Sequence, residues 1–228
     1  MSDVRGALSP RKSPVQARST ATIEALHVAA IQVLTKEGLA RCTTTRVAHR
    51  AGMSVGSLYQ YYPNRDALLA AVLEQHLDTV ASAVSRCCRE QHDKPVSDMA
   101  SALVSTFLAA KLGNPAESKA LYAVAGERGG AALVARVHTR MVEAIATMIA
   151  TASDAHFVSP TDTAAISLNA VVGPVRALLE GHAPPEFEAC LEVQLVRLLT
   201  AYLQSHCTPS KTGPTNTRGG RNPALERA

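Results

Sequence analysis

The sequence predicts an all-α protein of about nine helices, and three observations support this prediction. Ala, Leu and Val supply most of the apolar residues in the 228-residue chain, whereas aromatic residues make up 4% and Trp is absent. This composition favours helices because Ala and Leu lose little conformational entropy on entering one. Apolar residues recur with helical spacing along most of the chain, and no segment carries the signal of a strand or hairpin.

The N-terminal part of the chain contains three predicted helices, over residues 16–37, 45–51 and 54–61. Gly38 ends the first helix in the manner of a C′ glycine. Thr44 is a suitable N-cap for the second, and Ser54 for the third.

Longer helices follow. Asn64 is a suitable N-cap for a helix that runs to about Arg89. Beyond it, helical spacing predicts five more helices, which begin near Val96, Pro115, Leu133, Pro160 and Glu186. The fourth of these follows the N-cap pattern Ser-Pro-Thr-Asp and contains Gly173-Pro174, where a kink is expected.

Charge is unevenly distributed along the chain. Residues 1–66 carry nine Lys/Arg against four Asp/Glu, residues 67–206 ten against fourteen, and residues 207–228 four against one. A basic front on an acidic body indicates that the front meets a polyanion. A solvated basic segment is the alternative explanation.

The cysteines indicate a reducing environment. They number five, Cys42, Cys87, Cys88, Cys190 and Cys207, and show no C-x-x-C or Cys/His ligand spacing. No metal site, disulfide framework or cofactor is therefore expected. A thiol-based redox sensor stays open as an alternative.

The N-terminus lacks the apolar region of a secretory signal, and no apolar run reaches the ~18 residues of a membrane span. We therefore expect a cytoplasmic protein with no membrane partner.

Two motifs overlap between Gly52 and Gly56. The five residues match G-x-S-x-G, the turn that presents a nucleophilic serine in many hydrolases, with Ser54 at its centre. That turn requires a preceding apolar strand, whereas residues 46–51 are charged and helically spaced. A serine hydrolase that uses Ser54 is the alternative, but it lacks this context, so we expect no enzymatic activity and no catalytic residue.

The same stretch fits a helix-turn-helix. Ala48 is the small residue where the second helix crosses the first, Gly52 allows the tight turn, and Leu58 fills the gap between the helices. The outward positions are small at the N-terminal end of the second helix and hydrogen-bonding at its C-terminal end. Small residues let a backbone approach the major groove of DNA, and a helix N-terminus favours a phosphate.

At these residues the chain resembles the TetR family of bacterial transcriptional regulators. The stretch TTTRVAHRAGMSVGSLYQYYPNRDALL is similar to the common pattern of that family, and the resemblance covers about residues 17–77. Met53 stands in place of the usual Val or Ile, Tyr62 in place of Phe, and Arg65 in place of Lys.

The resemblance implies a three-helix DNA-binding head on a six-helix body that holds a ligand pocket and a dimer interface. The expected organisation is a disordered basic arm at 1–15, a helix-turn-helix domain at 16–77, a ligand-binding and dimerisation domain at 78–206, and a disordered basic tail at 207–228. The implied function is a homodimeric regulator, most simply a repressor that a small-molecule inducer releases from an inverted-repeat operator in double-stranded DNA.

The resemblance also implies roles for residues of the head. Thr44, Thr45 and Arg46 are expected to touch the DNA backbone, and Ser54, Ser57, Tyr61 and Arg65 to hold phosphates. Candidates for contact with base edges are Val55, Gly56, Tyr59 and Gln60, since Gln suits adenine and Val suits a thymine methyl group. Packing inside the head is the alternative role for Tyr59. Arm contacts by Arg11, Lys12 and Arg18 are a further expectation.

The last two predicted helices are apolar on nearly every face. A helix of this kind must be buried on every face, and a four-helix bundle between two copies of the chain satisfies that requirement. In the last helix the apolar residues are Leu191, Val193, Leu195, Val196, Leu198, Leu199, Tyr202 and Leu203.

The body is expected to hold the inducer pocket, because such pockets are apolar with a few polar groups. Ordinary core packing is the alternative for these residues. The expected lining is Met99, Phe107, Tyr122, His138, Met141, Met148, Phe157 and Asn169.

Overall fold

The computed structural model describes residues 14–127, 129–205 and 207–208. Nearly all of the expected arm and tail lie outside the described residues, as do Arg11, Lys12 and the side chain of Arg18. The described residues confirm the all-α prediction with nine α-helices and one short 3₁₀ helix. The helices are α1 (Pro14–Glu37), η1 (Leu39–Arg41), α2 (Thr44–Arg50), α3 (Val55–Tyr59), α4 (Arg65–Glu90), α5 (Val96–Leu112), α6 (Pro115–Ala125), α7 (Gly130–Ile149), α8 (Pro160–Glu180) and α9 (Phe187–Ser205).

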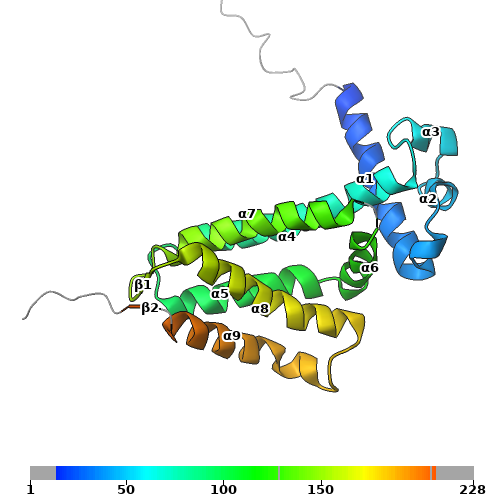
Figure 1. The fold of residues 1–228 in the computed structure, drawn as a ribbon. Coiled ribbons are helices and arrows are strands. Elements are labelled where there is room, and N and C mark those ends of the chain that lie inside the picture. Colours follow the sequence, from blue (N-terminus) through cyan, green and yellow to red (C-terminus); the bar gives the residue numbers. More distant parts are fainter. Residues whose placement is uncertain (1–13, 128, 206, 209–228) are drawn as a thin grey trace, which may run out of the picture.

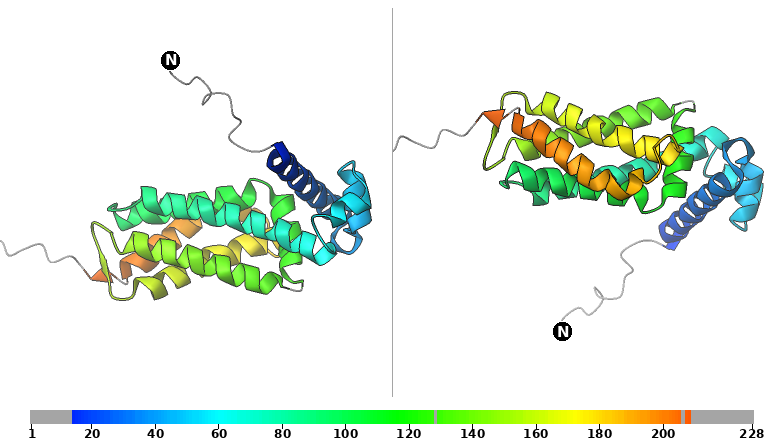
Figure 2. Two further views of the ribbon diagram at one scale, coloured as in Figure 1. Left: turned by 90° about the horizontal axis from the view of Figure 1, so that it is seen from above. Right: turned by 90° about the horizontal axis from the view of Figure 1, so that it is seen from below.

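The head, formed by α1, η1, α2 and α3, lies at one end of an elongated helical body (Figures 1 and 2). Its core includes Leu26, Val47 and Leu58, which are all fully buried. Gly38 ends α1 with a positive φ of 82°, as the glycine predicted, and its N–H donates to the carbonyl of Leu34. Val124 of α6 belongs to the same cluster, so the head is packed onto the body.

The N-cap of α2 differs from the expectation. Thr43, not Thr44, has extended backbone angles, and its side chain accepts a hydrogen bond from the Arg46 N–H at 3.3 Å. Thr44 is already in the helix. Three consecutive threonines occupy positions 43–45, and all are competent caps, so the sequence does not distinguish between them.

Helix α4 connects the head to the body, where it packs beside α7 (Figure 1). Asn64 caps it as predicted, by accepting a hydrogen bond from the Ala67 N–H at 2.8 Å. Ion pairs from Glu74 to Arg136 and from Asp78 to Arg140 hold its exposed side against α7.

Helix α4 is also long and apolar enough to meet the criteria for a membrane span by length and composition alone, contrary to the expectation from the sequence. In this fold it is a core helix. Leu69, Val72 and Val84 on it are buried among the other helices. A helix that makes ion pairs with its neighbour and buries one face in a protein core satisfies the requirements of a core helix without any lipid.

The body consists of α5 to α9 around a second apolar core, which includes Met99, Phe107, Ile145 and Leu168. Helix α8 continues through Pro174 and ends at Gly181, which has a φ of 81°. Ser159 occupies the N-cap position of α8, but its hydroxyl donates to the Asp162 carboxylate at 2.6 Å instead of accepting from the backbone.

Helices α8 and α9 divide their apolar residues between two faces. Leu195 and Leu199 are buried in the protein's own core, with exposed fractions of 3% and 1%. Ile166, Val193 and Leu198 point away from it and are 53%, 52% and 52% exposed. An apolar surface therefore remains on the outside of these two helices, as the sequence predicted, but Leu195 and Leu199 are not part of it.

The expectation that the chain contains no strand is wrong in one place. β1 (His156–Phe157) pairs antiparallel with β2 (Cys207–Thr208), at the end of the body opposite the head (Figure 1). Each strand has only two residues, which is too short for alternating hydrophobicity to be visible in the sequence.

Candidate functional site

Helices α2 and α3 form a helix-turn-helix with the contacts that the sequence predicted. Ala48 and Leu58 are fully buried between the two helices. Gly52 has a φ of 69°, which side chains rarely tolerate, and the N–H of Met53 then donates to the Ala48 carbonyl at 3.0 Å. The turn is therefore fixed by one glycine and by close packing on either side of it.

Ser54 serves this turn as a helix cap. Its oxygen accepts from the Ser57 N–H at 3.0 Å, and the two hydroxyl groups lie 2.9 Å apart. A nucleophile needs a base within hydrogen-bonding reach and a strand that presents it. The hydroxyl of Ser54 has a serine partner instead, and a helix precedes it.

The outer face of α3 is open to solvent. Gly56, Tyr59 and Gln60 are exposed, and Val55 is half-buried. A Cβ added at Gly56 would meet only the Ser54 hydroxyl, at 3.8 Å, so nothing inside the protein requires a glycine there. A small residue with no internal role leaves room for a close approach from outside.

Tyr59 lies on this face and is 50% exposed, so the alternative of core packing does not hold. Its hydroxyl lies 3.3 Å from the Thr44 hydroxyl on α2, which links the two helices at their outer edge. Thr45 is exposed beside it. Arg46 is exposed too and forms an ion pair with Glu37. The threonines, Tyr59 and the outer face of α3 thus share one surface of the head.

Arg65 has a different environment from the one expected of a phosphate contact. Its guanidinium donates to the carbonyl of Cys42 at 2.7 Å and to that of Leu39 at 2.8 Å. Asp66 and Glu127 lie 3.6 and 4.0 Å from it. Arg65 thus ties the start of α4 to the head, which is a structural role.

Tyr62 and Tyr61 both pack against the head core. The additional hydroxyl of Tyr62 has a partner, because His27 Nε2 lies 2.6 Å away. The other ring nitrogen of His27 is hydrogen-bonded to Gln75 on α4. This buried histidine therefore joins α1, the end of the helix-turn-helix and α4.

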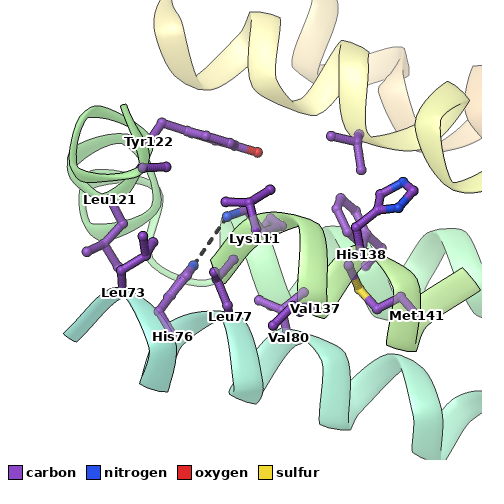
Figure 3. A pocket seen from close by; sticks show the side chains of 14 residues that line it. Leu73, His76, Leu77, Val80, Lys111, Leu121, Tyr122, Val137, His138 and Met141 are labelled. Atoms are coloured by element: carbon purple, nitrogen blue, oxygen red, sulfur yellow. Dashed lines mark hydrogen bonds between the residues drawn. The ribbon is translucent and has the colours of Figure 1, made fainter. Parts of the chain in front are cut away.

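The body contains a pocket bordered by α4, α5, α6, α7 and α8, with about 630 Å³ of empty space including its opening (Figure 3). Four of the expected residues line it: Phe107, Tyr122, His138 and Met141. The other lining residues are Leu73, His76, Leu77, Val80, Lys111, Leu121, Ala125, Val134, Val137 and Val172.

The remaining expected residues do not line this pocket. Met99, Met148 and Phe157 are buried in the core of the body, which was the alternative for them, and Phe157 lies on β1 and not on a helix. Asn169 is exposed on α8, and its amide donates to the Ala165 carbonyl at 2.8 Å. Helical periodicity identifies inward positions but does not separate a cavity wall from a filled core.

Two polar residues of the pocket were not predicted from the sequence. Lys111 is only 6% exposed, and its ammonium lies 3.2 Å from His76 Nε2. His76 Nδ1 lies in turn 3.2 Å from the Glu117 carboxylate. Desolvation and the neighbouring Lys111 lower the pKa of His76, which keeps the ring neutral. From the sequence, a lysine near the end of a helix is predicted to be exposed to solvent, and no local pattern indicates that it is buried.

Two of the five cysteines offer little reactivity. Burial raises the pKa of the Cys42 thiol to about 11 and that of Cys88 to about 12. Cys87 is buried beside Cys88, and Cys190 is exposed on α9. Because the thiolate is the reactive form, Cys42 and Cys88 are poor redox sensors.

A helix-turn-helix head with an exposed outer face, on a helical body with an internal pocket, is typical of one class of DNA-binding regulators. Two family models match the chain. Residues 26–72 match the bacterial regulatory proteins of the tetR family, and residues 95–203 match the tetracyclin repressor-like C-terminal domain. The chain therefore belongs to the TetR family and is a DNA-binding transcriptional regulator.

Individual relatives agree with this assignment. The nucleoid occlusion factor SlmA of Haemophilus ducreyi is 33% identical over 84 residues, 36% of this chain and 39% of that protein. The chain thus spans about two fifths of the length of this curated relative. A protein from Mesorhizobium loti described as a TetR-family transcriptional regulator has the same fold, with a TM-score of 0.70 at 14% identity over 84% of this chain and 99% of that one.

Two similar structures contain small molecules. The SmeT–triclosan complex has a TM-score of 0.63 at 18% identity, over 90% of this chain and all of that chain. The transcriptional regulator FadR from Bacillus subtilis in complex with stearoyl-CoA has a TM-score of 0.65 at 11% identity, over 78% and 98%. At these identities the similarity concerns the fold alone.

Proposed function

We propose that the protein is a homodimeric repressor that a small molecule releases from its operator. The observation that carries this proposal is the position of α4. This helix begins at Arg65, which donates to the carbonyls of Leu39 and Cys42 in the head. From eight residues later onward it lines the pocket with Leu73, His76, Leu77 and Val80. A ligand that moves the pocket wall therefore moves the head.

The DNA would lie against the outer face of α3. In this arrangement Gln60 and Val55 read base edges, Gly56 allows the backbone to approach, and Ser54 and Ser57 hold phosphates. Thr44, Thr45, Arg46 and Tyr59 border the same surface and would contact the DNA backbone or bases beside it. Tyr61 packs against the head core, and Arg65 donates to backbone carbonyls of the head. Both would contribute to DNA binding by positioning the head.

The dimer would form through the exposed apolar faces of α8 and α9. Ile166, Val193 and Leu198 leave a hydrophobic surface that a second copy covers by two-fold symmetry. Two heads then present two copies of α3, and such a dimer recognises an inverted repeat whose half-sites are about 34 Å apart.

Release would follow from the differential affinity of the ligand for two spacings of the heads. A ligand can shift this equilibrium only if it binds one spacing better, and couplings of this kind are typically about 1–3 kcal/mol. Filling the pocket changes the distance between α4 and its neighbours α5 and α6, and so tilts α4.

The DNA-binding part is tested with an operator selected from random double-stranded DNA by the wild-type protein. Gln60→Ala is expected to lose about 1–3 kcal/mol of discrimination at one base position while it keeps its affinity for unrelated DNA. Thr45→Ala, on the neighbouring exposed surface, is expected to weaken all sequences about equally. Equal losses on specific and unrelated DNA for Gln60→Ala would show that Gln60 does not read a base.

A further inference from the structure

Lys111 is a cation placed in a mostly apolar wall. It lies near the end of α5 and is 6% exposed, and Leu73, Phe107 and Leu121 line the same pocket. Desolvation lowers the pKa of its ammonium to about 8. At neutral pH the group is still charged, and a buried charge without a partner is strongly disfavoured.

The ammonium of Lys111 has unused hydrogen-bonding capacity. It has three N–H donors, and within the described part of the chain only His76 Nε2, at 3.2 Å, accepts one of them. The nearest carboxylate, that of Glu117, is separated from Lys111 by the His76 ring. Because a neutral His76 donates from Nδ1 to Glu117, its Nε2 is free to accept from Lys111.

The ammonium of Lys111 lines the pocket and lies over the face of the Tyr122 ring, a cation–π contact that leaves two of its N–H groups without an acceptor among the described residues. The ring of Tyr122 lies 4.5 Å from Nζ, and its hydroxyl is directed across the pocket (Figure 3). Val80, Val137 and Met141 form the rest of the wall near α4 and α7. The pocket therefore offers cationic and hydroxyl donors at Lys111 and Tyr122, whereas most of the remaining wall is hydrocarbon and sulfur, with the His138 ring beside Met141.

We propose that the pocket takes an amphipathic organic anion, whose acid group pairs with Lys111 and whose hydrocarbon body lies against the apolar wall. This inference rests on the proposed ligand-responsive function and specifies its ligand. A carboxylate accepts the two unused N–H groups of Lys111 and the hydroxyl of Tyr122. Charge-assisted hydrogen bonds of this kind are about twice as strong as neutral ones.

Ligands of other charge fit the site less well. A cationic head would meet Lys111 directly and would be repelled. A neutral alcohol accepts only part of the available hydrogen bonds and leaves the buried ammonium unneutralised. Lys111 should therefore make the protein bind an acid more tightly than the alcohol of equal chain length.

Calorimetric titration of the full-length protein without DNA tests this selection. The probes are two matched pairs, octanoate with 1-octanol and 4-phenylbutyrate with 4-phenyl-1-butanol. We expect the wild-type protein to bind at least one acid about tenfold or more tightly than its alcohol. Lys111→Met, which keeps the length of the side chain, should bring the ratio to about one, and the exposed Lys119→Met on α6 should leave it unchanged.

Three results would overturn the inference: alcohols that bind as tightly as the acids, an acid preference that survives Lys111→Met, or no binding by either acid. Release of the protein from its operator, measured with the same acids and alcohols, distinguishes failure of the anion site from failure of the proposed function. Release by the alcohol as well as by the acid leaves a ligand-responsive regulator and refutes the anion site. Tight, selective binding of acid without any release keeps the anion site and refutes the proposed mechanism of induction.

Discussion

Lys111→Met should stabilise the protein, although it removes a hydrogen bond. An ordinary lysine has a pKa of 10.5, and burial lowers that of Lys111 to about 8. This difference corresponds to about 3 kcal/mol by which the folded protein disfavours the charged ammonium, at 1.36 kcal/mol for each pKa unit. Methionine removes this penalty and the hydrogen bond to His76 together, and the expected net gain at pH 7 is about 1–3 kcal/mol.

The gain should depend on pH in a defined direction. Below pH 8 the lysine is charged in the folded and unfolded states, so the whole penalty is present. Between about 8 and 10.5 the unfolded chain still binds the proton that the folded protein has lost, and the stability of the wild-type protein therefore rises with pH relative to that of the variant. At pH 10 the difference between the two proteins should fall below about 1 kcal/mol.

Other titrating groups affect both proteins nearly equally, except His76, whose pKa is lowered by desolvation and by Lys111 and rises in the variant. This rise adds to the gain of the variant at pH 7 and has no effect at pH 10, where the ring is neutral in both states. His76 of α4 and Tyr122 of α6 contact Lys111, and Glu117 of α6 pairs with His76. His138 of α7 lines the same pocket, and Arg176 of α8 lies over the Tyr122 ring. All of these groups are present in both proteins. The buried thiols have raised pKa values, so they lower stability with rising pH, but they also cancel in the difference.

The assay is urea unfolding at pH 7 and pH 10 at equal protein concentration, with the exposed Lys119→Met as the control. The control should change the free energy of unfolding by less than about 0.5 kcal/mol at either pH. A Lys111→Met variant that is less stable than the wild-type protein at pH 7 would show that His76 and Glu117 fully compensate the ammonium. A stability difference that is the same at both pH values would contradict the desolvation argument.

Two further predictions concern the dimer surface and the head. Leu198→Glu should leave the fold intact and give monomers in sedimentation velocity, because this side chain is 52% exposed on the outside of α9, whereas Leu199→Glu, at 1% exposure, should unfold the body. A folded dimer of Leu198→Glu would place the interface elsewhere. Tyr62→Phe introduces the residue that is usual at this position in the TetR pattern. It should nevertheless lower the free energy of unfolding by about 1–2 kcal/mol, measured by thermal unfolding, because the buried His27 loses its hydrogen-bond partner at 2.6 Å. Tyr59→Phe, which removes an exposed hydroxyl, is the matched control, and equal effects of the two would show that the His27 contact contributes nothing.

The head could be predicted from sequence because its determinants are local. Ala48, Gly52 and Leu58 lie within eleven residues, and each has a steric requirement that only a few residue types meet. The exact cap could not be predicted, because Thr43 and Thr44 are chemically identical candidates. Which of them enters the helix depends on how η1 and α2 are held in the folded head, which local sequence does not contain.

The pocket was only half predictable, for a physical reason. Phe107 and Met141 were correctly placed in its lining and Met99 and Met148 were not, although all four are inward residues of helices. Whether an inward residue meets a cavity or a neighbour depends on how far apart the helices lie, which is a tertiary property. The burial of Lys111 could not be predicted for the same reason, because it results from the approach of α4 and α6 to α5. The outer apolar face of α9 likewise depends on its rotation about its own axis.

The central claim is that the pocket and the DNA-binding head are coupled through α4. The most direct test is the affinity for octanoate, measured once with the free protein and once with the protein saturated with its selected operator. Linkage requires that operator binding lower the affinity for the ligand by the same factor by which the ligand lowers the affinity for the operator. A coupling free energy of about 1–3 kcal/mol corresponds to a factor of about 5–150. The account predicts weaker octanoate binding within this range in the presence of operator. Equal affinities in the two titrations would contradict it.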